Sequence, residues 1–326
     1  MPFKFYFNRL LFLFIIATIV ISCKKDNKLE KEIANIGIKV DIERFDKLFS
    51  NASPNDLNAL KMAYPFMFSN TYSDTFWIDK MNDILQKELF FEVEKTFPNM
   101  DGTKQEMESL FNHLKYYFPQ FKTPRIITTT SDVDYRNKVI VTDTIVIVSL
   151  DTYLGSDHEF YKGIQQYIVA DMNKEQIVVD MADAYAKKYM RRPQGKTLLD
   201  EMIYHGKLLY FKDVIIPFKT EAERISYTQK QLDWALANEH YMWRYFVERE
   251  LLYSTDSKLP ARFIIDAPFS KFYLEDIDTE SPDKIGQYIG WQIVRAYMNQ
   301  NEVPLITLFD TSTEEIFNKS KFKPRK

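Results

Sequence analysis

The spacing of apolar residues predicts helices along most of the chain. Within residues 101–118, apolar side chains recur at steps of three and four, at Met107, Leu110, Phe111 and Leu114. This is the period of a helix that buries one face. Comparable spacing, with turn and capping residues at the ends, predicts further helices over residues 54–64, 73–97, 157–169, 175–190, 197–214, 229–253, 283–299, 304–309 and 313–318.

Three shorter stretches have the pattern of β-strands. Apolar and polar residues alternate in residues 36–48, which is the period of a strand. Residues 125–130 and 138–150 are rich in β-branched side chains, and Thr142-Asp143 divides the second stretch into a hairpin. The pattern therefore predicts a mostly α fold with a small central β-sheet, of the α+β class. With no repeat and no clear linker, residues 36–326 are expected to form a single compact domain.

The N-terminus has the pattern of a lipoprotein signal peptide over residues 1–22. Lys4 and Arg9 precede a run of apolar residues from 10 to 21, which is too short to span a bilayer as a helix. The run ends Val-Ile-Ser-Cys, which resembles a bacterial lipobox with Cys23 at the modified position. Cleavage before Cys23 leaves residues 23–35 as an acylated tether, and the covalent lipid is the only cofactor expected. The alternative is an uncleaved N-terminal anchor helix with an incidental cysteine.

Composition removes several classes of site. The 326 residues include 8 glycines, and none of them forms a dinucleotide-binding or P-loop motif. A single cysteine excludes disulfides and thiolate metal sites, and neither H-E-x-x-H nor G-x-S-x-G occurs. The 43 Lys and Arg are interspersed with 46 Asp and Glu, so nothing indicates a nucleic-acid partner. No catalytic residue and no metal ligand is predicted.

One set of residues is the candidate for a cleft. Gly206 lies in the middle of a predicted helix, where glycine is unfavourable unless a helix or a cleft comes close. It follows His205, and Arg295 belongs to a helix whose two glycines, four residues apart, predict a close helix crossing. Arg295 is expected to pair with a buried carboxylate. If the protein were an envelope hydrolase, its site would involve these residues together with Asp183 and Tyr185.

Several separated blocks of sequence resemble one known family. They are Cys23 with its lipobox and residues 40–48, 116–123, 131–137, 150–158, 251–259, 267–273 and 285–297. In this order they resemble the gliding-motility lipoprotein GldB family of Bacteroidota. The resemblance implies a lipid-anchored envelope protein required for gliding and tied to the type IX secretion machinery. Its expected partners are the membrane, through acyl chains, and other envelope proteins; its expected location is the periplasmic face of the outer membrane. A lipoprotein assembly factor is the further alternative.

A second resemblance concerns the fold. The order of strands and helices is similar to that of predicted zinc peptidases with H-E-x-x-H on a first helix and a glutamate on the second. Here Ala182 and Ala186 would occupy the two histidine positions, and His205 would occupy the glutamate position. Alanine has no lone pair to offer a metal, so this resemblance implies a degenerate zincin-like metallopeptidase fold, a pseudo-metallopeptidase whose former cleft serves binding.

Overall fold

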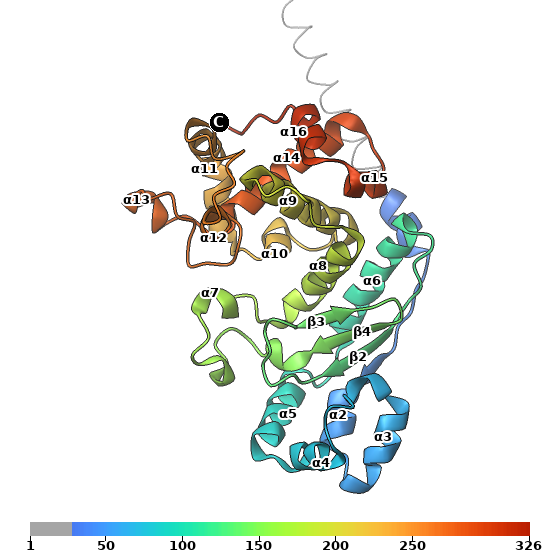
Figure 1. Ribbon diagram of the computed structural model, residues 1–326. Coiled ribbons are helices and arrows are strands. Elements are labelled where there is room, and N and C mark those ends of the chain that lie inside the picture. The colour runs from blue at the N-terminus through green and yellow to red at the C-terminus, as the bar shows by residue number, and fades with distance from the viewer. Residues whose placement is uncertain (1–27) are drawn as a thin grey trace, which may run out of the picture.

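The computed structural model describes residues 28–326 (Figure 1). The predicted signal peptide and Cys23 lie outside these residues. Residues 28–34 form a helix in which Ile33 is buried. The folded part of the chain therefore begins within the segment 23–35 that was expected to be a tether.

A four-stranded sheet lies in the middle of the molecule. Its strands are β1 (Ile42–Arg44), β2 (Arg125–Thr129), β3 (Val139–Val141) and β4 (Ile145–Ser149), in the order β1-β2-β4-β3. The pairs β1–β2 and β2–β4 are parallel, whereas β3 and β4 form the predicted antiparallel hairpin. Successive side chains of a strand point to opposite faces. Accordingly, Ile126 belongs to the main core and Ile127 to a second, smaller core.

The smaller core belongs to a lobe on one face of the sheet (Figure 1). The lobe consists of α2 (Phe45–Ser50), α3 (Leu57–Ala63), α4 (Asp74–Asn82) and α5 (Ile84–Thr96). Aromatic rings fill it, and the ring centroids of Phe68 and Trp77 are 4.9 Å apart. The prediction of one helix over residues 73–97 was wrong. Asp83 adopts extended backbone and accepts a hydrogen bond from the Gln86 N–H, so it ends α4 and caps α5.

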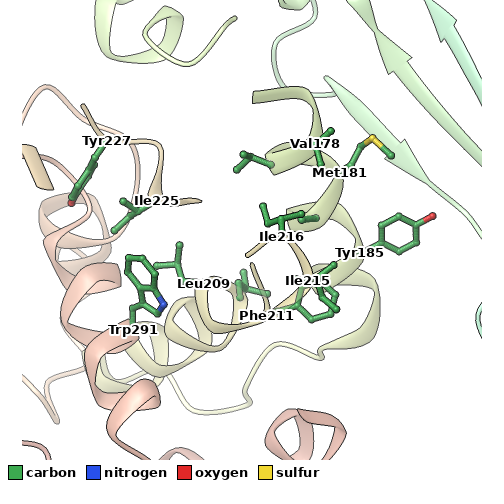
Figure 2. Packing of buried hydrophobic residues seen from close by; sticks show 14 of the residues in the cluster. Val178, Met181, Tyr185, Leu209, Phe211, Ile215, Ile216, Ile225, Tyr227 and Trp291 are labelled. Carbon is green, nitrogen blue, oxygen red and sulfur yellow. The ribbon is translucent and has the colours of Figure 1, made fainter. Parts of the chain in front are cut away.

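The main body covers the other face of the sheet and extends away from it (Figure 1). Against the sheet lie α6 (Asp101–Tyr117) and α8 (Ile177–Tyr189), which packs on α9 (Leu198–Ile215). The remaining helices are α7 (Gln166–Val169), α10 (Glu221–Ile225), α11 (Gln229–Glu248), α12 (Leu259–Phe263), α13 (Glu275–Asp278), α14 (Ile285–Asn301), α15 (Leu305–Asp310) and α16 (Thr313–Ser320). Figure 2 shows apolar side chains of α8, α9 and α14, including Val178, Leu209 and Trp291, packed in this core.

The predicted close helix crossing is present between α9 and α14. A Cβ atom on Gly206 would collide with the backbone of Gly290, and a Cβ on Gly290 would collide with the backbone of Met202. Glycine at both positions therefore lets the two backbones touch. Close packing of the two helices therefore accounts for Gly206, and a cleft is not needed to explain it.

The α+β class is confirmed, while several element boundaries were wrong, and the helix expected over 229–253 ends at Glu248. The strand expected in residues 36–48 is limited to Ile42–Arg44, because α2 begins at Phe45. The helix expected over 157–169 is reduced to Gln166–Val169, preceded by a 3-10 helix over Glu159–Tyr161 and a turn in which Gly163 has φ +95°. Among residues 28–326, no helix has the length and apolar character that crossing a membrane requires.

Candidate functional site

Helix α8 places its charged residues on one face. Its apolar residues Ile177, Met181 and Tyr185 recur at four-residue steps and are buried. Asp180, Asp183 and Lys187 follow one another at steps of three and four, so they share another face of the helix. This face is the starting point of a charged cluster.

Asp183 holds two ammonium groups. Its carboxylate lies 2.6 Å from Lys187 Nζ on α8 and 3.6 Å from Lys212 Nζ on α9. Burial would raise the pKa of Asp183, but the charges of Lys212 and Lys187 outweigh this effect and lower that pKa to about 2. Asp183 is therefore ionised throughout the physiological range, although its side chain is only 26% exposed.

His205 lies on α9 beside this group. Burial lowers the pKa of His205 to about 4, and the charges of Lys187, Arg192 and Lys212 act in the same direction, whereas Asp183 opposes them. The imidazole is therefore neutral at pH 7. Its Nε2 is 3.8 Å from Glu201, but a neutral ring forms no ion pair there. The structure thus brings Asp183 and His205 together, as the sequence suggested, but gives the histidine no charge.

A second part of the cluster joins α8 to the sheet. Lys138, which precedes β3, lies 2.7 Å from Asp180 and 3.7 Å from Asp171. The Tyr153 hydroxyl donates a hydrogen bond of 2.8 Å to the same Asp180 carboxylate. Burial lowers the pKa of Lys138, but Asp180 and Asp171 reverse this effect and raise it overall. Lys138 is therefore firmly cationic.

A third part comes from the start of α14. Lys284 has φ 52° and precedes the first residue of the helix. Its ammonium lies 2.9 Å from Asp266 and 3.6 Å from Asp283. Burial acts to lower the pKa of Lys284, and the two carboxylates reverse this to a net increase. The electrostatic effects of Lys284 extend to Lys212 and Asp171, so the three parts form one constellation.

We call this set the charged cluster. It comprises the side chains Lys138, Asp171, Asp180, Asp183, Lys187, Lys212, Asp266, Asp283 and Lys284. Lys212 is the exception among its cations, because the side chain is only 8% exposed and its ammonium donates no hydrogen bond to any other described residue. Burial lowers its pKa accordingly, with Asp183 opposing. In residues 28–326, no three His, Cys, Asp or Glu side chains are placed to hold a metal ion. The carboxylates and ammonium groups of the cluster therefore largely satisfy one another.

The other predicted cleft residues lie elsewhere. Tyr185 is two residues from Asp183, and residues two apart on a helix face in different directions. It lies against Phe111 and Phe121, away from the cluster. Arg295 pairs with a carboxylate, as expected: its guanidinium makes hydrogen bonds of 2.6 and 2.9 Å to Asp213 and stacks on Trp291. Arg224 and Trp291 also donate to Asp213, so these groups form a closed structural network.

Sequence reasoning missed most members of the charged cluster. The steps between Asp180, Asp183 and Lys187 were a usable signal, as was Lys212 within an otherwise apolar helix. Lys138, Asp171, Asp266 and Lys284 belong to segments separated by tens of residues, and no local pattern connects them. The degenerate metallopeptidase resemblance stays a prediction; α8 and α9 occupy its two helices, and Ala182 and Ala186 are completely buried.

The chain was also compared with known proteins. The family model described as gliding motility protein GldB matches residues 26–324, which is nearly the whole chain. Neither a curated protein nor a solved structure matches. The resemblance found in the separated sequence blocks is therefore confirmed. The chain belongs to the GldB family of lipoproteins, which is named for its role in gliding motility.

Proposed function

We propose that this protein is anchored by a lipid on Cys23 in the outer membrane, on its periplasmic face, and supports gliding by binding other proteins of the envelope. The observation that carries the proposal is the family match, which covers residues 26–324 and so begins three residues after Cys23. Two or more acyl chains provide the stable attachment that one chain does not. The associated machinery would be that of gliding and type IX secretion.

An exposed apolar surface on the lobe supports the protein-binding role. Ile84, Leu85 and Phe91 on α5 are each about two-thirds exposed or more, and Ile84 and Phe91 lie two turns apart on one side of the helix. We call these three residues the lobe patch. Large exposed apolar patches mark sites that bind partners, so these three residues are our candidates for that surface.

The anchor is tested by Cys23→Ala in the full chain, with Lys24→Ala as the neighbouring control. Cys23→Ala should retain its leader and lose normal processing, and the mass of the N-terminal peptide should lack acyl groups. Lys24→Ala should be processed and acylated like the wild type. Normal processing and membrane partition of Cys23→Ala would contradict the anchor.

The binding role is tested by Phe91→Lys in gliding cells. Tyr253→Lys is a matched control, because both side chains are 67% exposed. Phe91→Lys should impair gliding and remove specific proteins from the cross-linked set, while Tyr253→Lys should leave both unchanged. If both variants glide and retain the same cross-linked proteins, the lobe patch is not the binding surface. Recovery of envelope peptide or glycan fragments, or of many unrelated lipoproteins, would favour the hydrolase or the assembly factor instead.

A further inference from the structure

Six aromatic rings line a cavity of about 610 Å³ beside the end of α8. They belong to Tyr117, Phe118, Phe121, Tyr185, Tyr189 and Phe309. The ring of Phe118 stacks on Tyr189 with centroids 4.7 Å apart and on Phe309 at 5.9 Å. The rings come from the end of α6 and the loop after it, from α8 and from α15. We call this the aromatic cavity, and its lining is suited to an apolar ligand.

One polar group in the lining has no partner. The Tyr185 side chain is buried, and its hydroxyl makes no hydrogen bond to any described residue. Figure 2 shows the ring pointing away from the neighbouring core residues of α9, with the hydroxyl at its far end. Burial raises the pKa of Tyr185, so the hydroxyl keeps its proton and can donate. Buried hydroxyls nearly always find an acceptor, and a ligand oxygen could supply it here.

The rim of the cavity differs from its interior. Lys188 pairs with Asp143 at 2.5 Å, and Lys122 and Asp310 add one charge of each sign. Ile306 also lines the cavity and is 60% exposed. An apolar interior under a charged rim fits an amphipathic molecule, with its chain inside and its polar end at the surface.

The aromatic cavity lies next to the beginning of the described chain. The Glu30 carboxylate is 3.3 Å from His113 Nε2 on α6. Tyr117 lies one turn further along α6 and lines the cavity; burial raises its pKa to about 12, with a contribution from the charge of Glu30. Cys23 precedes Lys28 by five residues, which span at most about 18 Å. The anchor proposed above therefore holds this side of the protein close to the membrane.

We propose that the aromatic cavity binds the acyl end of a lipid. The hydrocarbon chain lies against the aromatic rings, and a carbonyl or carboxyl oxygen accepts a hydrogen bond from the Tyr185 hydroxyl. That the cavity lies close to the membrane rests on the proposed anchor at Cys23, whereas the lining of the cavity and the free hydroxyl are independent of that anchor. The acyl chain comes either from a lipid of the bilayer or from the group on Cys23 itself, and the two sources leave different products in a cross-linking experiment.

The test uses the full chain in cells supplied with a fatty acid that carries a diazirine and an alkyne. After illumination, adducts should concentrate on peptides containing residues 117–122, 185–189 and 306–310. An adduct that phospholipase shortens identifies a bilayer lipid. An adduct that joins a cavity peptide to the Cys23 peptide identifies the protein's own chain. Either product supports acyl binding.

Ile306→Glu is the test variant and Ile265→Glu is its matched control. Ile265 is exposed to a similar extent, at 54%, but belongs to the loop after α12 and does not line the cavity. A carboxylate beside a bound chain should lower the cavity adducts about tenfold. Ile265→Glu should leave the adducts unchanged, and both variants should accumulate to wild-type levels. Adducts spread evenly over the surface, or a yield unaffected by Ile306→Glu, would overturn the inference. Acylated Cys23 without cavity adducts would overturn acyl binding and leave the proposed anchor intact. Cavity adducts without acylated Cys23 would support acyl binding and overturn the anchor.

Discussion

Helix α8 carries charges on one face and aromatic rings on another, and the two faces treat their polar groups differently. On the charged face, each carboxylate has an ammonium within 4 Å, as with Asp180 and Lys138 at 2.7 Å. On the aromatic face, the Tyr185 hydroxyl has no protein partner. The charged face is nearly complete without a ligand, with Lys212 as the exception. On the aromatic face, the buried Tyr185 hydroxyl remains available to a ligand.

The largest expected effect tests the charged face through pH. Unfolded histidine titrates near 6.5, whereas the pKa of His205 in the folded protein is about 4. As the pH falls through this window, His205 binds a proton in the unfolded state but not in the native state. The free energy of unfolding due to His205 should therefore decrease by up to about 3 kcal/mol between pH 6.5 and 4.

The measurement is urea unfolding from pH 7.5 to 4.5, taken as the difference between wild type and His205→Gln. The difference is needed because Asp151 titrates in the same window with the opposite sign; burial raises its pKa to about 6. His205→Gln should gain stability relative to wild type as the pH falls. A curve for His205→Gln that runs parallel to wild type would show that His205 is not held neutral.

The second prediction compares a carboxylate of the charged face with one at the rim of the aromatic cavity. Asp183→Ala leaves the buried Lys212 ammonium without its counter-charge, and we expect a loss of about 2 kcal/mol, reduced from the value for fully buried pairs because Asp183 is partly exposed. Adding Lys212→Met should restore most of the loss, because no ammonium then needs a partner. Asp143→Ala removes the exposed partner of Lys188 at the aromatic cavity and should change stability little.

Chemical unfolding of the four proteins at pH 7 checks this prediction. If Asp183→Ala and Asp143→Ala lower the free energy of unfolding equally little, the ion pairs of the charged face stabilise the protein no more than ordinary surface ion pairs. If Lys212→Met fails to restore Asp183→Ala, the loss comes from Lys187 or from repacking.

Local sequence signals predicted the helices that build both faces. The helix at 101–118 and the helices now called α8 and α9 were placed within about two residues, because their apolar periodicity agrees with their burial. The break at Asp83 was missed because the apolar spacing continues across it, although an aspartate before Ile84 is a recognisable cap. The long-range parts of the fold carried no comparable signal.

The candidate site was predictable only where a helix period could be used. Asp183 and His205 come together because α8 and α9 are consecutive and pack on each other. Tyr185 was grouped with them because the metallopeptidase resemblance places it in the segment of the zinc motif, yet a two-residue step turns it to the other face. Lys138, Asp266 and Lys284 reach α8 through tertiary folding, which no spacing in the sequence records. The family resemblance, in contrast, was confirmed because it rested on ordered blocks along the whole chain.

The smallest expected effect addresses the aromatic face, through Tyr185→Phe. A buried hydroxyl without a partner is unfavourable, so its removal should raise the free energy of unfolding of the lipid-free protein by about 1 kcal/mol. Tyr161→Phe is the matched control: its buried hydroxyl donates to the Asp151 carbonyl oxygen and accepts from the Leu154 N–H, both at 2.8 Å. That variant should lose about 2 kcal/mol, because the amide is left without an acceptor. Opposite signs in the two variants would establish that the hydroxyl on the aromatic face is free for a ligand. A loss in both would mean that Tyr185, like the carboxylates on the charged face, already has its partner.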